Sequence, residues 1–263
     1  MMGISQITFD IADRIWDSVK YAIENNEDEV IVDISDFNLS IISFNTKIEK
    51  VKTLTIYINP DKKHASVIIF SLNNNISIYL GTNDNNYYII KNRLIHEIKH
   101  MIDSAFKSKN LLNDTKRFFD GDYFTQLLVD DIKKNNNGEL CSIDEFMLKQ
   151  YDDSVYRKFL IYCYLANDDE LSAIFQVFYN KVKTSKNLLN TIKEEENKHP
   201  LIYYKQMVNF SFNFDELKKN EKNYILNNID KKNLKKVEAY IRKQGQLFIK
   251  KLHKLAYFQE QYD

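Results

Sequence analysis

The run His96-Glu97-Ile98-Lys99-His100 is the feature that most constrains what this chain of 263 residues can form. It lies in a stretch of helical periodicity at residues 92–106, whose apolar stripe consists of Leu94, Ile98, Met101, Ile102 and Ala105. Two histidines four residues apart on a helix project from one face, so both imidazoles can bind one metal ion, and zinc is the expected metal. Glu97 can reach a water molecule at that metal. The competing interpretation is a pair of surface histidines on an ordinary amphipathic helix.

A catalytic zinc site needs a third protein ligand and keeps a fourth position open for water or substrate. The best candidate is Glu170, which begins a second predicted helix at residues 170–182. Ala173 is small enough to let this helix pack closely against the motif helix. In the alternative interpretation, Asn167 caps the helix and Glu170 is its capping-box partner, which binds backbone N–H groups instead of a metal.

Asp103 is the competing acidic residue, because it lies on the same helix face as His96 and His100. A third ligand from the same helix would approach the metal from the same side as the two histidines, which does not suit a tetrahedral site. We therefore expect Asp103 to orient one imidazole through its other ring nitrogen. An ordinary surface aspartate is the alternative.

The downstream spacing resembles a known family. HExxH followed some seventy residues later by a helical glutamate, in the pattern Tyr164-x5-Glu170-x2-Ala173, is similar to the gluzincin branch of the zinc metallopeptidases, especially the small, divergent members encoded by bacteriophages and mobile elements. The resemblance covers roughly residues 50–180. It implies zinc bound by His96, His100 and Glu170, with Glu97 as general base and acid. The sequence departs from the family pattern at Asp169, where well-studied members carry asparagine, and no aspartate follows at the usual offset.

The pattern of elements predicts an α+β, zincin-like fold. An amphipathic helix at residues 10–25, capped by Asp10, precedes strand-like runs at 30–34, 53–58, 65–72 and 76–80, of which the last two read as a hairpin. An N-terminal helix and a mostly antiparallel sheet before the metal-binding helix are the order expected of a zincin. Residues 111–153 are irregular and predict either the rim of a cleft or a disordered insertion. We expect residues 1–185 to form the zincin-like metallopeptidase domain and 186–263 a helical C-terminal region.

Composition limits the classes of protein to which this chain can belong. No stretch approaches eighteen apolar residues and no basic region precedes an apolar run at the N-terminus, so we expect neither a transmembrane helix nor a secretory signal. Cys141 and Cys163 form no CxxC pair, which favours a reducing compartment and structural or incidental thiols. The expected location is cytoplasmic, or virion-associated if a phage encodes the chain. Only 5 glycines and 2 prolines exclude collagen-like and proline-rich classes and a Gly-rich phosphate loop.

The last predicted helix, residues 231–257, combines a heptad stripe with strong basic character. Its apolar positions are Leu234, Ile241, Phe248 and Leu255, and its basic residues are Lys231, Lys232, Lys235, Lys236, Arg242, Lys243, Lys250, Lys251 and Lys254. It can dock on the rest of the chain, form a coiled coil, or contact nucleic acid or an acidic partner. Docking is the first expectation, because the whole chain is neutral and the remainder is therefore acidic.

These observations predict a zinc-dependent peptidase whose substrate is a peptide or protein. Zn²⁺ would lower the pKa of a bound water to about 7, and Glu97 would take the proton of that water and pass it to the leaving amine. Candidates for stabilising the oxyanion are Tyr164, His199, Tyr203 and Tyr204. Two alternatives are a virion or assembly protein that retains a zincin scaffold, and a nucleic-acid-binding protein that acts through the basic C-terminal helix.

Overall fold

The computed structural model describes residues 5–42, 48–63, 65–68, 75–84, 86–110, 155–183, 185, 187–211 and 231–260. The chain is mixed α+β and divides into two compact units. Unit 1 comprises Met1–Lys116 and Ser172–Thr184, and unit 2 comprises Arg117–Leu171 and Ser185–Asp263. The division falls inside helix α6 (Asp168–Val182), which is continuous. The predicted loop region at 111–153, with Cys141, lies outside the described residues.

Unit 1 begins with helix α1 (Gln6–Glu24), which buries one apolar face. Ile11, Ile15, Val19 and Ala22 of that face were expected from the periodicity, and all four are fully buried. The predicted start at Asp10 is wrong, because the helix begins four residues earlier. Asp10 is an interior residue that accepts a hydrogen bond from Gln6 Nε2 (2.9 Å). Ser5 holds the N-cap position without a side-chain capping bond.

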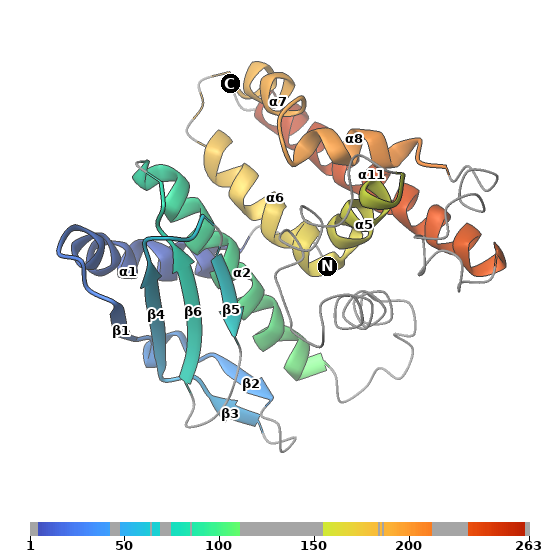
Figure 1. The fold of residues 1–263 in the computed structure, drawn as a ribbon. Coiled ribbons are helices and arrows are strands. Elements are labelled where there is room, and N and C mark those ends of the chain that lie inside the picture. The colour runs from blue at the N-terminus through green and yellow to red at the C-terminus, as the bar shows by residue number, and fades with distance from the viewer. Residues whose placement is uncertain are drawn as a thin grey trace. The chain divides into compact units, whose positions relative to one another are not determined.

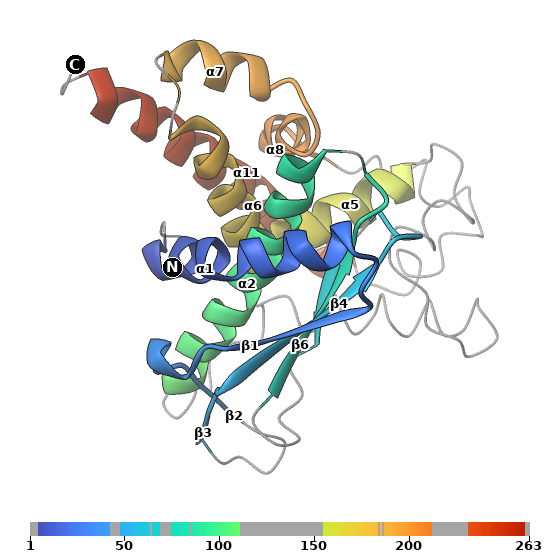
Figure 2. The same ribbon diagram turned by 90° about the vertical axis from the view of Figure 1, so that its left-hand side faces the viewer.

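A four-stranded sheet lies against α1 and α2 (Tyr87–Asn110), which cover the same face (Figures 1 and 2). Its strands are β1 (Glu29–Asp33), β4 (Thr53–Asn59), β5 (Ala65–Ile68) and β6 (Asn75–Gly81), in the order β1-β4-β6-β5. Alternate residues face the helices, so the buried positions recur with period two. They are Leu54, Ile56 and Ile58 of β4 and Ile76, Ile78 and Leu80 of β6.

The pairing of the strands agrees with a mostly antiparallel sheet. β1 pairs with β4, and β5 with β6, in antiparallel register, with Ala65 opposite Leu80 as the predicted hairpin requires. The central pair β4–β6 is parallel, with Ile56 opposite Ile78. A second, two-stranded sheet of β2 (Ser40–Ile42) and β3 (Ile48–Lys50) was not expected.

The described part of unit 2 is helical outside its turns. After α5 (Val155–Ala166) and the start of α6 come α7 (Leu188–Glu195), α8 (Leu201–Val208) and α11 (Lys231–Glu260). Helix α8 runs alongside α11 (Figure 1), and the rings of Tyr204 and Phe248 stack between them at a centroid distance of 3.9 Å. Among the described helices, none has the length and apolar character needed to cross a bilayer.

Candidate metal centre

Helix α2 carries the HExxH residues and is fixed at its start by the end of strand β6. Asn86 caps the helix, since its Oδ1 accepts a hydrogen bond from the Tyr88 amide (2.9 Å). Arg93 donates to the carbonyl of Gly81 (3.0 Å) and to Asp84 Oδ2 (3.1 Å). The position of the first turn of α2 is thus set by the sheet.

The apolar stripe predicted for this helix is buried as expected. Leu94, Ile98, Met101 and Ile102 are each at most 1% exposed and belong to the core of unit 1. The side chain of Ala105 lies outside the described residues. Burial of this stripe fixes the rotation of α2 about its axis, and therefore the direction in which the motif residues project.

His96 and His100 form a close pair of half-buried imidazoles. Their Nε2 atoms lie 3.0 Å apart, and the rings are nearly perpendicular, with an interplanar angle of 82° and a centroid distance of 4.6 Å. At this distance one imidazole N–H can donate to the other ring. When both rings instead carry their proton on Nδ1, the lone pairs of both Nε2 atoms are free to bind one shared cation.

Glu170 completes the group from a different helix. His96, His100 and Glu170 each offer one ligand atom, and these atoms all lie within 4.8 Å of one another. Glu170 stands in the first turn of α6, two residues before the part of this continuous helix that belongs to unit 1. The structure thus brings together the three residues that the sequence proposed as ligands.

Polar contacts attach α6 to α1 and α2. Gln176 is fully buried and makes two hydrogen bonds of 2.9 Å with the backbone of Ser5, one from the Ser5 amide to Oε1 and one from Nε2 to the Ser5 carbonyl. Asn180 Nδ2 donates to Asn92 Oδ1 of α2 (3.0 Å). This contact joins α6 to α2 at a residue that precedes the HExxH motif.

The capping of α6 does not require the Glu170 carboxylate. Asn167 Oδ1 accepts from the Asp169 amide (3.0 Å), and the Asn167 carbonyl accepts from the Leu171 amide (2.9 Å). In a capping box, Glu170 would accept from the Asn167 amide. That amide already donates to the Tyr164 carbonyl (3.1 Å). The N-cap is therefore supplied by Asn167, and the capping-box role considered for Glu170 is not seen.

The donor set and its spacing fit a zinc ion. Imidazole nitrogen and carboxylate oxygen are common zinc ligands, and zinc bonds of 2.0–2.1 Å in a tetrahedron place ligand atoms about 3.3 Å apart. The Nε2 separation of 3.0 Å is close to that value. The separations to the carboxylate are at most 4.8 Å, which a small rotation of the Glu170 side chain would close. Other divalent transition metals accept the same donors, so the geometry supports a metal centre without fixing the element.

The charged residues around the histidines are unusually buried. Glu97 is 6% exposed and Lys99 is 3% exposed, although both side chains normally remain in water. Lys99 Nζ donates to Asp103 Oδ1 as an i,i+4 ion pair. Asp103 Oδ2 is buried and has no hydrogen-bond partner among the described residues. The expectation that Asp103 orients an imidazole is therefore wrong, because its recorded partner is Lys99.

The candidates for oxyanion stabilisation differ in their surroundings. Tyr204 is fully buried and its hydroxyl donates to the Leu165 carbonyl (3.0 Å). Burial, with a smaller contribution from the charge of Glu170, raises the pKa of Tyr204 well above its ordinary value. The hydroxyl proton of Tyr204 is thus already donated to a backbone carbonyl. The rings of His199 and Tyr203 pack edge to face at 5.3 Å, and Tyr164 is half-buried in α5.

Burial raises the pKa of the Cys163 thiol, which keeps it protonated and unreactive at neutral pH.

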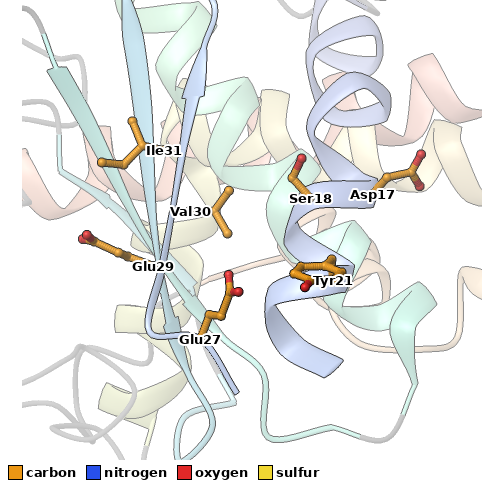
Figure 3. Close-up of a pocket in the computed structure, with 7 residues that line it drawn as sticks. All are labelled: Asp17, Ser18, Tyr21, Glu27, Glu29, Val30 and Ile31. Atoms are coloured by element: carbon orange, nitrogen blue, oxygen red, sulfur yellow. The ribbon is translucent and has the colours of Figure 1, made fainter. Parts of the chain in front are cut away.

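A shallow hollow of about 490 Å³ lies between α1 and β1 (Figure 3), with Val30 directed toward the helix. It is lined by Asp17, Ser18, Tyr21, Glu27, Glu29, Val30 and Ile31, none of which is a proposed ligand.

Comparisons with known proteins add no assignment. No family model matches the chain, and no curated protein and no solved structure was found to be similar to it. The resemblance to gluzincins therefore rests on the residues of the two motifs alone.

Proposed function

We propose that the protein is a zinc-dependent peptidase. The observation that carries the proposal is the convergence of His96, His100 and Glu170 from two helices onto one point. Two imidazoles and one carboxylate leave a fourth tetrahedral position open, which is the arrangement of catalytic rather than structural zinc sites. A zinc ion bound there would lower the pKa of a water molecule and polarise a carbonyl group of the substrate.

Glu97 is the proposed general base and acid. It lies on α2 three residues before His100, so the two side chains are separated by about 60° around the helix axis. Its carboxylate would accept the proton of the attacking water and deliver it to the nitrogen of the leaving amine. A glutamate with 6% exposure on the helix that carries the histidines fits this role better than that of a solubilising surface residue.

The replacement of Glu97 by glutamine tests this proposal. The amide keeps the shape of the side chain and cannot accept the proton, so we expect Glu97→Gln to retain its zinc while hydrolysis slows by at least about 10²-fold. Zinc content and cleavage of a broad pool of peptides and denatured proteins are measured on the same samples. Glu194→Gln, at an exposed position of α7, is the matched control and should cleave at the wild-type rate.

Two results would contradict the proposed mechanism or the proposed zinc site. Wild-type cleavage that Glu97→Gln leaves unchanged would assign the activity to a contaminant or to another site, and would remove the proposed mechanism even in a zinc-containing protein. Absence of zinc from protein that was never exposed to a chelator, with no uptake on zinc addition, would remove the proposal itself.

A further inference from the structure

Docking of α11 within unit 2 determines which of its residues remain accessible. Its apolar stripe is buried, including Val237, Ile241, Phe248 and Leu252, and α8 is its main partner. The expectation that this helix docks on its own chain is thereby confirmed. The opposite face must be exposed, and it carries most of the described basic residues of the helix.

Four lysines form a row along this exposed face. Lys235, Lys243, Lys250 and Lys254 are all exposed, and at 100° per residue they fall within about 100° around the helix axis. They extend over about 28 Å, since an α-helix rises 1.5 Å per residue. The other exposed residues between Lys235 and Lys254 are Ala239, Gln246, Leu247 and His253, and none of them is acidic. We refer to these four lysines as the lysine row.

No ion pair is recorded between the lysine row and an acidic residue of the described part of the chain. Glu238 of α11 lies on the buried side and pairs with Arg242 (2.8 Å). Glu196 pairs with Lys205 (3.3 Å) and lies 3.3 Å from His253. The ion pairs recorded for this helix therefore involve its other basic residues, and the positive charge of the row is not neutralised by them.

The composition of this face favours a nucleic-acid partner over a lipid surface or a protein. A helix that lies in a membrane surface needs an apolar face, and that of α11 is already buried. Protein interfaces are depleted in lysine and enriched in aromatic residues and arginine, which this face lacks among its described exposed residues. Phosphate groups along a nucleic-acid strand, in contrast, are bound by lysines as point charges without a requirement for shape.

We propose that the lysine row binds the phosphate backbone of nucleic acid without sequence preference. Neutralising about four phosphates of duplex DNA predicts a slope of about −3.6 for log K against log salt concentration. Affinity should therefore fall by about 10²-fold between 50 and 200 mM salt. This binding is independent of the metal centre, because it uses another helix and other residues.

Fluorescence anisotropy with a labelled 20-base-pair DNA duplex of arbitrary sequence tests the proposal on the full chain. The double variant Lys243→Gln/Lys250→Gln should weaken binding equally for unrelated sequences and reduce the magnitude of the slope by about 2. Lys193→Gln, at an exposed position of α7 in the same unit, is the matched control and should leave the slope unchanged. Circular dichroism melting verifies that each variant is folded.

Several outcomes would overturn the proposal. These are no binding of the duplex at 50 mM salt, a slope that the double variant does not change, or an equal loss in Lys193→Gln. Binding to phosphatidylserine-containing vesicles in place of the duplex would also overturn it, and would assign the row to a lipid surface.

Discussion

Lys99 donates a hydrogen bond to Asp103 one turn further along α2, on the helix that carries His96 and His100. Lys99 is almost completely buried, so its charge depends on the carboxylate for compensation. The pair therefore has a structural function in the motif helix. This relationship separates Asp103, which stabilises the helix, from Glu170, which joins the ligand group.

Replacement of Asp103 should affect stability more than metal binding. Asp103→Ala leaves the buried Lys99 ammonium without its anion, and we expect a loss of about 3 kcal/mol in the free energy of unfolding. Glu170→Ala removes a ligand and should weaken zinc affinity by far more than the 10–100-fold typical of a residue that only orients a ligand. Urea denaturation of metal-free protein measures the first effect and a competitive chelator titration the second.

A double variant provides the control for the ion pair. In Lys99→Met/Asp103→Leu both charges are removed together, so most of the stability lost in Asp103→Ala should return. A larger loss of zinc affinity in Asp103→Ala than in Glu170→Ala would exchange the two roles and make Glu170 a helix-terminus residue only.

The histidine pair predicts the stoichiometry of metal binding. We expect about one zinc ion per chain in protein purified without chelator, and His96→Ala or His100→Ala should abolish stoichiometric binding, because each removes one of three ligands. Elemental analysis measures the metal directly. His253→Ala, at an exposed histidine of α11 outside the ligand group, is the matched control and should retain the full zinc content.

Local patterns predicted the elements of the site because the signal lies within a few residues. The periodicity of Leu94, Ile98 and Met101 is contained in two turns of α2, and it indicated the buried face correctly. The Glu170 helix was likewise expected, although it begins two residues earlier, at Asp168. The mutual position of the two helices depends on contacts such as Asn92–Asn180, which are 88 residues apart and leave no pattern in the sequence.

The errors have the same physical origin. The start of α1 was placed at Asp10 because aspartate is a good capping residue. The hydrogen bonds that hold the backbone of Ser5 come from the side chain of Gln176, which is 171 residues away and leaves no local signal. Asp103 was assigned to an imidazole from its helix face, yet the i,i+4 spacing to Lys99 was the signal that could have identified its partner. Strands β2 and β3 are three residues each, too short to show an alternation.

Gly245 marks a close approach of α11 to α8. A Cβ atom there would lie 2.9 Å from both the Met207 Cβ and the Tyr204 carbonyl oxygen, and 3.0 Å from the Val208 nitrogen. Alanine normally stabilises an exposed helix position by about 1 kcal/mol over glycine. Here overpacking against backbone atoms should outweigh that gain, so we expect Gly245→Ala to be destabilised by about 1–2 kcal/mol.

Thermal denaturation measures this effect, and Gln246→Ala is the matched control. Gln246 is the next residue of the same helix and is exposed, so its replacement by alanine should leave the melting temperature unchanged or slightly higher. A Gly245→Ala protein as stable as the wild type would mean that α8 and α11 can separate at this point without cost.

Tyr204 predicts a specific dependence of stability on alkaline pH. Burial, together with the nearby charge of Glu170, raises the pKa of this phenol in the folded protein well above its ordinary value of 10.0. Above pH 10 the unfolded chain can release the proton whereas the folded chain retains it. The stability present below pH 10 is therefore lost as the pH rises, by up to about 1.4 kcal/mol per pH unit from this group.

Tyr204→Phe should remove that part of the pH dependence. At pH 7 the variant loses the hydrogen bond to the Leu165 carbonyl and should be less stable by about 1–3 kcal/mol. As the pH rises above 10, the difference from the wild type should narrow, because the variant has no phenol to ionise at this position. Urea denaturation from pH 7 to pH 11 measures both effects, with Tyr21→Phe at an exposed position of α1 as the control. A difference that stays constant over this range would show that the Tyr204 hydroxyl ionises in the folded protein as readily as in the unfolded chain.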